Sequence, residues 1–455
     1  MKKSVRSRGR NLCTVVVCIA VLAVVVGCDT AHDDRLRAVA SASVSGVAVA
    51  GVQGPDGPLI YAGSSILEFK RGALDEIVRM PGTYRIGAMS ADLASSPGYF
   101  NGAVQLSSGD LVLIRDVFGP ETPDVFSHHE VGTMSLVDLE APPRAIIAAP
   151  HVAFLGVLSD ADADVLVCLS QDELPGTWWL TAEQDVGRPD HSEAWTHELG
   201  GSVAAVALSG SEKQARVGVL WMERGNAGDT YTPRLDVFDA DGALDEQRVI
   251  MPAYDRPSAL YPFFDGAIHG WVAEWREESS DLITLTRGDS TIELSGNDQE
   301  TAHDRVLAVG DLVKNLPGDE LLMNMGRADG ESRRAVIAAV TSQGLRVVTD
   351  IQEHGVGSAM AVDVDGDGLL EMIGTQSMPD SPVNARGEGP GQVFVWRFDA
   401  DGALESAIHS DVYERGASSL DVIDLDGDGV LEILAGYERG STESQAYVDV
   451  LKIGR

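Results

Sequence analysis

Two short acidic stretches have the residue types and the spacing to hold a metal ion. The first is Asp363-Val-Asp-Gly-Asp-Gly-Leu-Leu-Glu371, and it returns 61 residues later as Asp424-Leu-Asp-Gly-Asp-Gly-Val-Leu-Glu432. In each stretch, acids occupy positions 1, 3, 5 and 9, and a backbone carbonyl is available at position 7. Oxygen ligands in this number suit Ca²⁺, whereas Mg²⁺ prefers to keep its waters. The spacing therefore predicts two calcium loops.

The expected ligands are four carboxylates and one main-chain oxygen in each loop. They are Asp363, Asp365, Asp367, Glu371 and the backbone oxygen of Leu369 in the first loop, and Asp424, Asp426, Asp428, Glu432 and the backbone oxygen of Val430 in the second. Glycines at positions 4 and 6 let the chain curl through conformations that a side chain disfavours. Without a cation, the four carboxylates of a loop would repel one another.

The acidic stretches allow two other interpretations. An EF-hand loop also begins with acids at positions 1, 3 and 5, but it needs a glutamate at position 12. This chain has Gly374 or Ala435 there. The second alternative is an Asp-Gly hairpin turn with solvated acids. Repetition of the whole motif within the same apolar frame favours a metal loop over a simple turn.

Apolar residues on both sides of each loop indicate the elements that position it. Ala361 and Val362 precede the first loop, and Met372 and Ile373 follow it. Val422-Ile423 and Ile433-Leu434 flank the second loop in the same way. Such short apolar runs around a turn are typical of strands. Each loop is therefore expected to connect two strands and not two helices.

The loops resemble those of FG-GAP repeats, also called VCBS repeats, which build the propeller of integrin α subunits. The resemblance implies an all-β fold, a β-propeller of four-stranded blades in which the loop joins the first two strands. Two degenerate copies fit the same frame. One places Asp311 and Asp319 at positions 1 and 9 and is expected to be a blade without metal. The other keeps Asp160 and Asp164 at positions 5 and 9 and lacks the remaining acids and the glycines.

A second repeat supports the propeller. Phe238-Asp-Ala-Asp-Gly-Ala-Leu244 recurs as Phe398-Asp-Ala-Asp-Gly-Ala-Leu404, and each copy follows a strand-like run. An Asp-Gly pair between extended runs predicts a tight hairpin turn with a structural role. Strand-like runs that could open a blade recur at a spacing close to that of one blade, near Val47, Val104, Val152, Val203, Ile268, Val306, Met360 and Leu420.

The blade count follows from these openings and from the resemblance. Seven blades are expected, because the family more often closes with seven, and eight remain open. The propeller domain is predicted to span residues 43–455. Its final strand, Tyr447 to Ile453, is expected to share a blade with a strand near Val47 to Val49. Each blade contacts its neighbours, so none is expected to be stable alone.

The start of the chain has the pattern of an export signal. Basic residues precede an apolar run from Leu12 to Val26, which is too short for a spanning helix. The run ends in Val25-Val26-Gly27-Cys28, which resembles the lipobox of bacterial lipoproteins. Residues 1–27 are therefore predicted to be a lipoprotein signal peptide, Cys28 the lipidated residue and 28–42 a tether. An uncleaved anchor helix is the alternative.

The predicted location is the bacterial cell envelope, with the protein exported and attached to the membrane through the lipid on Cys28. The outer membrane or the cell surface is favoured. The inner membrane stays open, because Asp29 after a lipidated cysteine signals retention there in some bacteria.

The net charge of the chain limits the classes of binding partner that fit this protein, and its cysteine content bears on disulfide formation after export. The formal net charge is −36, and it becomes −41 without the five basic residues of the predicted signal peptide. Such a field repels phosphates, which argues against nucleic acid as a partner. After removal of the signal peptide, Cys168 is the one cysteine besides the predicted lipidation site. Its apolar surroundings predict a buried, inert thiol.

No Gly-x-Ser-x-Gly elbow, His-Glu-x-x-His motif, phosphate loop or dinucleotide fingerprint occurs in the sequence. The preferred hypothesis is a non-catalytic, calcium-stabilised propeller that binds a protein or a glycan at the cell envelope. Two alternatives remain. One is a polysaccharide hydrolase or lyase that uses the propeller channel, and the other is a scaffold in envelope assembly.

Overall fold

The structure is a computed structural model. It describes residues 35–454 except for 81–83, 87–103, 119–125, 140, 142, 150, 160–163, 173–175, 187, 189–190, 210–214, 225–230, 251–255, 265, 267–268, 277–280, 288–289, 295–304, 327–332, 343, 353–355, 378–389 and 440–444. In this part of the chain, no helix has the length and apolar character needed to cross a membrane.

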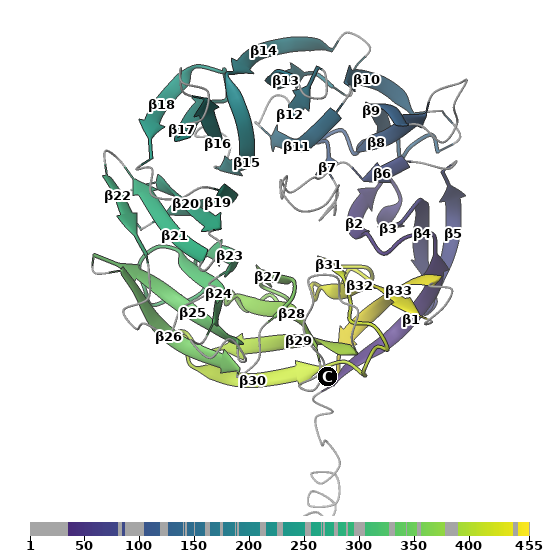
Figure 1. Cartoon of the computed structure of the whole chain (residues 1–455). Coiled ribbons are helices and arrows are strands. Elements are labelled where there is room, and N and C mark those ends of the chain that lie inside the picture. Colours follow the sequence, from purple (N-terminus) through teal and green to yellow (C-terminus); the bar gives the residue numbers. More distant parts are fainter. Residues whose placement is uncertain are drawn as a thin grey trace, which may run out of the picture.

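The described strands form eight sheets arranged in a ring, which is a β-propeller with eight blades (Figure 1). Blades are numbered 1 to 8 along the chain. Blade 1 comprises β2 (Val49–Gly54), β3 (Gly57–Ala62), β4 (Ser65–Lys70) and β5 (Ala73–Arg79), and blade 2 comprises β6 (Tyr84–Ile86), β7 (Val104–Gln105), β8 (Leu111–Phe118), β9 (Phe126–Met134) and β10 (Arg144–Ala149). In blade 2, β6 and β7 both pair with β8. Blade 3 comprises β11 (His151–Ser159), β12 (Asp164–Gln171), β13 (Trp178–Gln184) and β14 (Ser192–Leu199). Blade 4 comprises β15 (Gly201–Ser209), β16 (Arg216–Arg224), β17 (Tyr231–Asp239) and β18 (Leu244–Val249).

Blades 5 to 8 each have four strands, as blades 1, 3 and 4 do. Blade 5 comprises β19 (Arg256–Phe264), β20 (His269–Arg276), β21 (Asp281–Arg287) and β22 (Ser290–Glu293), and blade 6 comprises β23 (Arg305–Gly310), β24 (Glu320–Gly326), β25 (Arg333–Thr341) and β26 (Gly344–Gln352). Blade 7 comprises β27 (Ala359–Val362), β28 (Glu371–Ser377), β29 (Gly391–Phe398) and β30 (Leu404–His409). Blade 8 comprises β31 (Ser419–Ile423), β32 (Glu432–Arg439), β33 (Gln445–Ile453) and β1 (Leu36–Val44).

All neighbouring strands within a blade are antiparallel, and the first strand of each blade lies nearest the centre of the ring in Figure 1. The loops from first to second strands therefore emerge on one face of the propeller, together with the turns from third to fourth strands. The predicted calcium loops join β27 to β28 and β31 to β32, and so they lie on this face in two consecutive blades.

The ring is closed by strands from both ends of the chain. β1 pairs with β33, with Leu36 opposite Ile453 and Val44 opposite Ala446. The final strand thus shares its blade with an N-terminal strand, as expected, but the partner is Leu36–Val44 and not the run near Val47, which leads into β2 of blade 1. The boundary placed at residue 43 falls inside β1, so the propeller already includes residues of the segment expected to be a tether.

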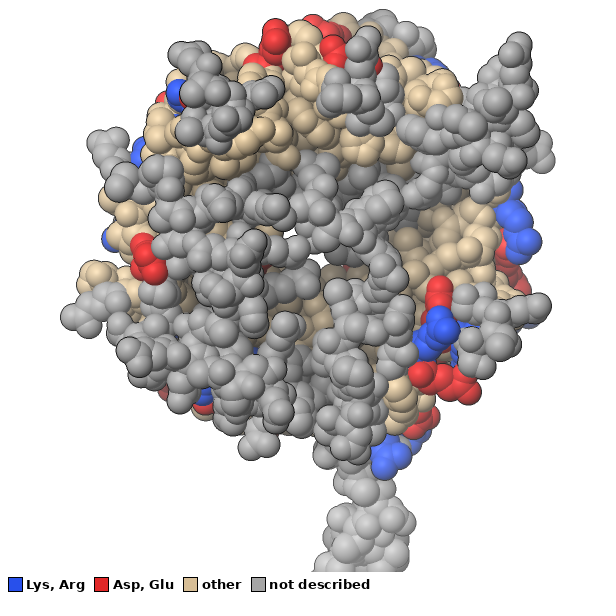
Figure 2. Space-filling view, viewed as in Figure 1, with Lys and Arg blue, Asp and Glu red and all other residues tan. Residues whose placement is uncertain are grey.

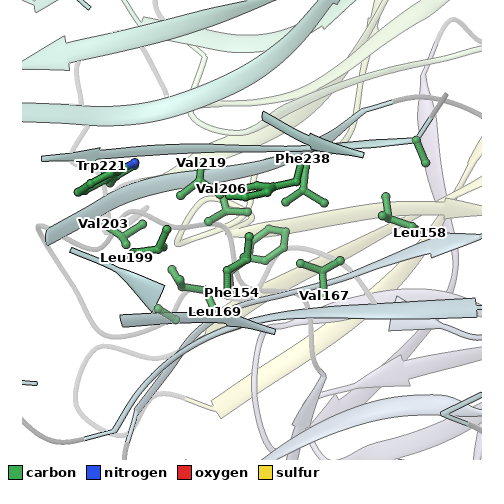
Figure 3. Close-up of a cluster of buried hydrophobic side chains, with 14 residues drawn as sticks. Phe154, Leu158, Val167, Leu169, Leu199, Val203, Val206, Val219, Trp221 and Phe238 are labelled. Carbon is green, nitrogen blue, oxygen red and sulfur yellow. The ribbon is translucent and has the colours of Figure 1, made fainter. Parts of the chain in front are cut away.

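Buried apolar side chains form eight clusters in the described residues, and each cluster lies between two consecutive blades. Figure 3 shows the cluster between blades 3 and 4, where Phe154 and Leu169 face Val206 and Phe238. Every blade therefore depends on two neighbours for its core. This arrangement explains why a single blade could not bury its apolar faces.

The structure has eight blades, the count that the sequence left open beside the favoured seven. Six of the eight predicted openings fall in or directly before the first strand of a blade. Val104 lies in β7, which pairs with β8 as the first strand β6 of blade 2 does, and Ile268 precedes the second strand β20. The first strand of blade 5 is β19, which contains Pro257 and Pro262. Proline is uncommon in strands, so the sequence did not indicate a strand there. β19 is an edge strand paired only with β20, and edge strands tolerate proline because one row of N–H groups has no partner in the sheet.

Both Asp-Ala-Asp-Gly repeats form the predicted turns between third and fourth strands. Gly242 and Gly402 adopt positive φ angles of 79° and 83°, which glycine tolerates best. In each turn an aspartate accepts the N–H of the residue four positions later, as in the 2.8 Å bond from Ala403 N to Asp399 Oδ1.

Acidic and basic side chains lie mixed around the rim of the face seen in Figure 2.

Candidate metal centre

Each predicted calcium loop gathers three carboxylates at its centre. The ligand atoms of Asp363, Asp365 and Glu371 all lie within 4.8 Å of one another in blade 7. Asp424, Asp426 and Glu432 form the equivalent group in blade 8 under the same distance limit. Positions 1, 3 and 9 of the motif therefore converge in both loops, as the spacing predicts.

The first acid of each loop holds the backbone in its curled form. Asp363 Oδ1 accepts the N–H of Gly366 at 2.7 Å, and Oδ2 accepts the N–H of Gly368 at 2.9 Å. Asp424 makes the same two bonds in its own loop, to the N–H of Gly427 at 2.7 Å and to the N–H of Gly429 at 3.0 Å. These four glycines have φ angles between 74° and 81°, in the region that side chains disfavour.

The last acid of each loop is buried at the start of the second strand. Glu371 is 3% exposed and Glu432 is 1% exposed. One oxygen of each accepts a backbone N–H at 2.7 Å, from Val364 and from Leu425 respectively. Burial raises the pKa of Glu371 to about 7, and repulsion from Asp365 and Asp367 also raises this pKa. The hydrogen bond from the Val364 N–H and the positive charge of Arg397 lower it and offset part of the rise.

The acids at position 5 are not part of these groups. Asp367 Oδ1 accepts the N–H of Leu369 at 2.7 Å, and Asp428 Oδ1 accepts the N–H of Val430 at 2.9 Å. Both aspartates are exposed, and they brace the loop from outside the three converging carboxylates. Their role as ligands, and that of the two carbonyls, stays a prediction.

A basic side chain from the third strand approaches each loop, which sequence reasoning did not predict. Arg397 Nη2 lies 2.8 Å from Asp365 Oδ2 in blade 7. Lys452 Nζ lies 2.5 Å from Asp426 Oδ2 and 2.8 Å from Glu432 Oε1 in blade 8. These contacts with carboxylates raise the pKa of Lys452 further above its ordinary value, so the ammonium group is charged at neutral pH.

The donor set fits a hard divalent cation. All converging side-chain atoms are carboxylate oxygens, the ligands that Ca²⁺ prefers. Asp365 Oδ1 is buried and accepts no hydrogen bond from the described residues, which leaves a ligand atom without a protein donor inside the group. If Ca²⁺ is bound, Asp363, Asp365 and Glu371 would hold it in blade 7, and Asp424, Asp426 and Glu432 in blade 8.

The degenerate copy in blade 6 has a register one residue away from the predicted one. Val313 N donates to Glu320 Oε2 at 3.0 Å, which matches the bond between Val364 and Glu371. Glu320 and not Asp319 therefore occupies position 9, Leu312 occupies position 1, and Lys314 occupies position 3. The loop thus lacks the acids at positions 1 and 3, and the absence of a metal from this blade stays a prediction.

Two acids of the degenerate copies, Asp319 and Asp164, contact neighbouring blades. Asp319 Oδ2 accepts the N–H of Phe264 in blade 5 at 2.6 Å. In blade 3, Asp164 occupies the position-9 place at the start of β12, where its Oδ2 accepts the N–H and the hydroxyl of Ser107 in blade 2 at 2.6 and 2.8 Å. Asp160 lies outside the described residues.

The sequence also predicts the roles of two individual cysteines, Cys28 and Cys168. Cys28, the predicted lipidation site, lies outside the described residues together with the whole predicted signal peptide. Cys168 is fully buried between blades 2 and 3, as expected, and burial raises the pKa of its thiol to about 12.

Fold and loops together define the class of this protein, an eight-bladed β-propeller of four-stranded blades. Residues 363–435 match the FG-GAP-like repeat family. The matched segment begins at the first acid of one loop and ends just after the second loop, and the chain is therefore a propeller that carries the FG-GAP-like repeat in blades 7 and 8. No curated protein matches the sequence.

Solved structures similar to this chain are distant in sequence. The WD40 domain of SCAP from fission yeast is 10% identical, with a TM-score of 0.42 over 92% of this chain and 98% of that chain. An acylaminoacyl peptidase of Pyrococcus horikoshii is 9% identical, with a TM-score of 0.43 over 77% of this chain and 51% of that chain. A Trypanosoma rangeli sialidase is 12% identical, with a TM-score of 0.35 over 77% of this chain and 60% of that chain.

Proposed function

We propose that this protein is a calcium-stabilised binding propeller, in which two calcium ions brace the blades where the ring closes. The observation that carries the proposal is the convergence of three carboxylates at equivalent places in blades 7 and 8. Blade 8 is built from both ends of the chain, so a cation in its loop would stabilise the closed ring. At a calcium concentration about a thousand times the dissociation constant, one filled site adds roughly 4 kcal/mol of stability.

A calorimetric calcium titration tests the metal part of the proposal. The full-length protein in detergent is compared with Asp365→Ala, with Asp426→Ala and with Asp241→Asn as a control. Asp241 is an exposed acid in the turn after β17 of blade 4, so its substitution removes a negative charge far from both loops. Two sites in the parent, one lost in each loop variant and none in the control, are expected. Folded parent protein that binds no calcium would refute the proposal.

The ligand of the propeller is proposed to be a protein or a glycan outside the cytoplasm. Support comes from the strongly acidic chain, from the acidic loops and from the export signal in the sequence. Extracellular calcium fills sites of moderate affinity, which suits this assignment. A glycan array and crosslinking in cells distinguish the two ligand classes. Turnover of a polysaccharide by the purified protein would instead establish the hydrolase or lyase alternative.

Attachment to the membrane through a lipid on Cys28 is the second part of the proposal. The basic and apolar regions before Val25-Val26-Gly27-Cys28 support it. Mass spectrometry of the N-terminal peptide and partitioning into detergent test it, with Cys28→Ser as the comparison. A lipidated Cys28 as the first residue is expected. A parent protein whose N-terminal peptide still carries residues 1–27 and an unmodified Cys28 would favour an uncleaved anchor instead.

A further inference from the structure

The basic residues near the two loops occupy one equivalent place in their blades. The register of β28 with β29 places Met372 opposite Trp396, and that of β32 with β33 places Ile433 opposite Leu451. One residue further along each register, the last loop acid comes level with Arg397 in blade 7 and with Lys452 in blade 8. Blade 6 provides the comparison, because its loop lacks the acids at positions 1 and 3. There the last acid, Glu320, pairs with Ala339. Among these three blades, a basic residue faces the last acid only in the two with a full set of loop acids.

Lys452 reaches into the carboxylates of blade 8. Its Nζ lies 2.5 Å from Asp426 Oδ2, 2.8 Å from Glu432 Oε1 and 3.6 Å from Asp428 Oδ2. Asp426 and Glu432 are two of the three converging acids. Because Glu432 is only 1% exposed, water screens this contact poorly. The ammonium group therefore contacts the same oxygens that a calcium ion would need.

Arg397 makes a more peripheral contact in blade 7. Its Nη2 lies 2.8 Å from Asp365 Oδ2, but its Nε is 4.0 Å from Glu371 Oε1. The other oxygen of Asp365 accepts no hydrogen bond from the described residues. The guanidinium group thus neutralises one acid at the edge of the group and leaves Asp365 Oδ1 open to a cation.

We propose that Arg397 and Lys452 are built-in counter-cations of the two loops, and that Lys452 competes with calcium for Asp426 and Glu432. The inference rests on the proposed calcium function and adds a difference between the two sites. Calcium must displace the Lys452 ammonium group in blade 8, whereas it enters beside Arg397 in blade 7. The blade 8 site therefore binds calcium more weakly, and the paired carboxylates of its loop keep the ring folded when calcium is scarce.

Calcium titrations of Lys452→Met and Lys452→Gln test the competition. Both variants are made in an Asp365→Ala background, so that blade 8 holds the one remaining site in the full-length protein. Lys70→Met is the matched control, because Lys70 forms an exposed ion pair with Glu68 in blade 1. We expect calcium affinity to rise at least tenfold on substitution of Lys452 and to stay unchanged in the control. Arg397→Met, in an Asp426→Ala background, is expected to raise affinity about threefold or less.

Thermal unfolding in EDTA supplies a readout that does not depend on bound metal. Without calcium, loss of Lys452 leaves Asp426 and Glu432 to repel each other, so the midpoint should fall below that of the parent and recover on addition of calcium. Unchanged or weaker calcium affinity in both Lys452 variants would overturn the competition. An unchanged midpoint in EDTA would overturn the counter-cation role. Loss of all calcium binding by the folded parent would refute the proposed function itself, a separate outcome.

Discussion

The backbone N–H of Leu431, in the acidic loop of blade 8, donates a 2.8 Å hydrogen bond to the carbonyl oxygen of Val364, in the acidic loop of blade 7. The two loops are therefore joined through main-chain atoms as well as through the apolar cluster between their blades. Order in one loop should favour order in the other, because each loop holds one end of the shared bond.

This bond predicts that the two calcium sites are coupled. Asp365→Ala should abolish binding in blade 7 and weaken the remaining site in blade 8 by roughly threefold, within the range of couplings measured for residues in contact. Calorimetry on the variant and the parent gives the comparison. Equal affinity of the blade 8 site in both proteins would show that the Leu431 to Val364 bond transmits no coupling.

The buried carboxyl of Glu320 predicts a pH dependence of stability that is independent of calcium. Burial raises its pKa to about 7. Because the folded state binds this proton more tightly than the unfolded chain, the contribution is fully present below about pH 4.5 and is lost as the pH rises through 7. Between pH 5 and pH 8, the parent should lose about 2 kcal/mol more stability than Glu320→Gln, whose amide oxygen can still accept the N–H of Val313.

Urea unfolding in EDTA at the two pH values measures this difference. Glu405→Gln is the control, because Glu405 is exposed on the outer strand β30. The control should follow the parent. A Glu320→Gln variant with the same pH dependence as the parent would contradict the assignment of this titration to Glu320.

The pairing of β1 with β33 predicts a large cost for removing β1. Deletion of residues up to 44 removes the buried side chains of Leu36, Ala40 and Val44 and exposes the edge of β33. The free energy of unfolding should fall by about 4 kcal/mol, and the exposed edge should promote self-association. Denaturant titration and sedimentation velocity check both effects. Deletion of residues up to 34 serves as the control and should leave the stability unchanged.

Close packing between blades 4 and 5 predicts the effect of a single methyl group. A Cβ on Gly218 would lie 2.7 to 2.9 Å from ring atoms of Trp271. Gly218→Ala should therefore destabilise the protein by about 1–3 kcal/mol, the usual cost of overpacking a core. In Gly310→Ala, the control, the nearest atom to the added Cβ is 4.0 Å away, on Leu312. Similar thermal midpoints for the two variants would show that Trp271 can move aside.

The thiol of Cys168 should resist chemical modification in the folded protein. Burial raises its pKa to about 12, so almost no thiolate is present at pH 8, and thiolate is the reactive form. A thiol reagent added to a chain from residue 29, where Cys168 is the one cysteine, should react only after unfolding in urea. Rapid modification of the folded chain would reveal local opening between blades 2 and 3.

Local chemistry in the sequence predicted the loops and turns, because their function depends on residues close together in the chain. Asp363 and Glu371 converge within one loop, and the Asp-Gly turns need only their own residues. The register of blade 6 was missed by one residue, since several acids in succession do not show which one faces inward. The strand β19 was not predicted, because it contains two prolines. Proline is tolerated in an edge strand, but a sequence does not indicate which strand lies at an edge.

The sequence by itself determined the acidic loops, the glycines that shape them and the repetition that indicates a propeller, all of which depend on short-range spacing. Only the tertiary structure decided the number of blades, because ring closure depends on the pairing of Leu36–Val44 with Gln445–Ile453 across the whole chain. It also placed Arg397 and Lys452 beside the loops. Glu371 and Arg397 are 26 residues apart, while Glu432 and Lys452 are 20 apart, so no constant spacing identifies them. Strand pairing alone brings each basic side chain to its carboxylates.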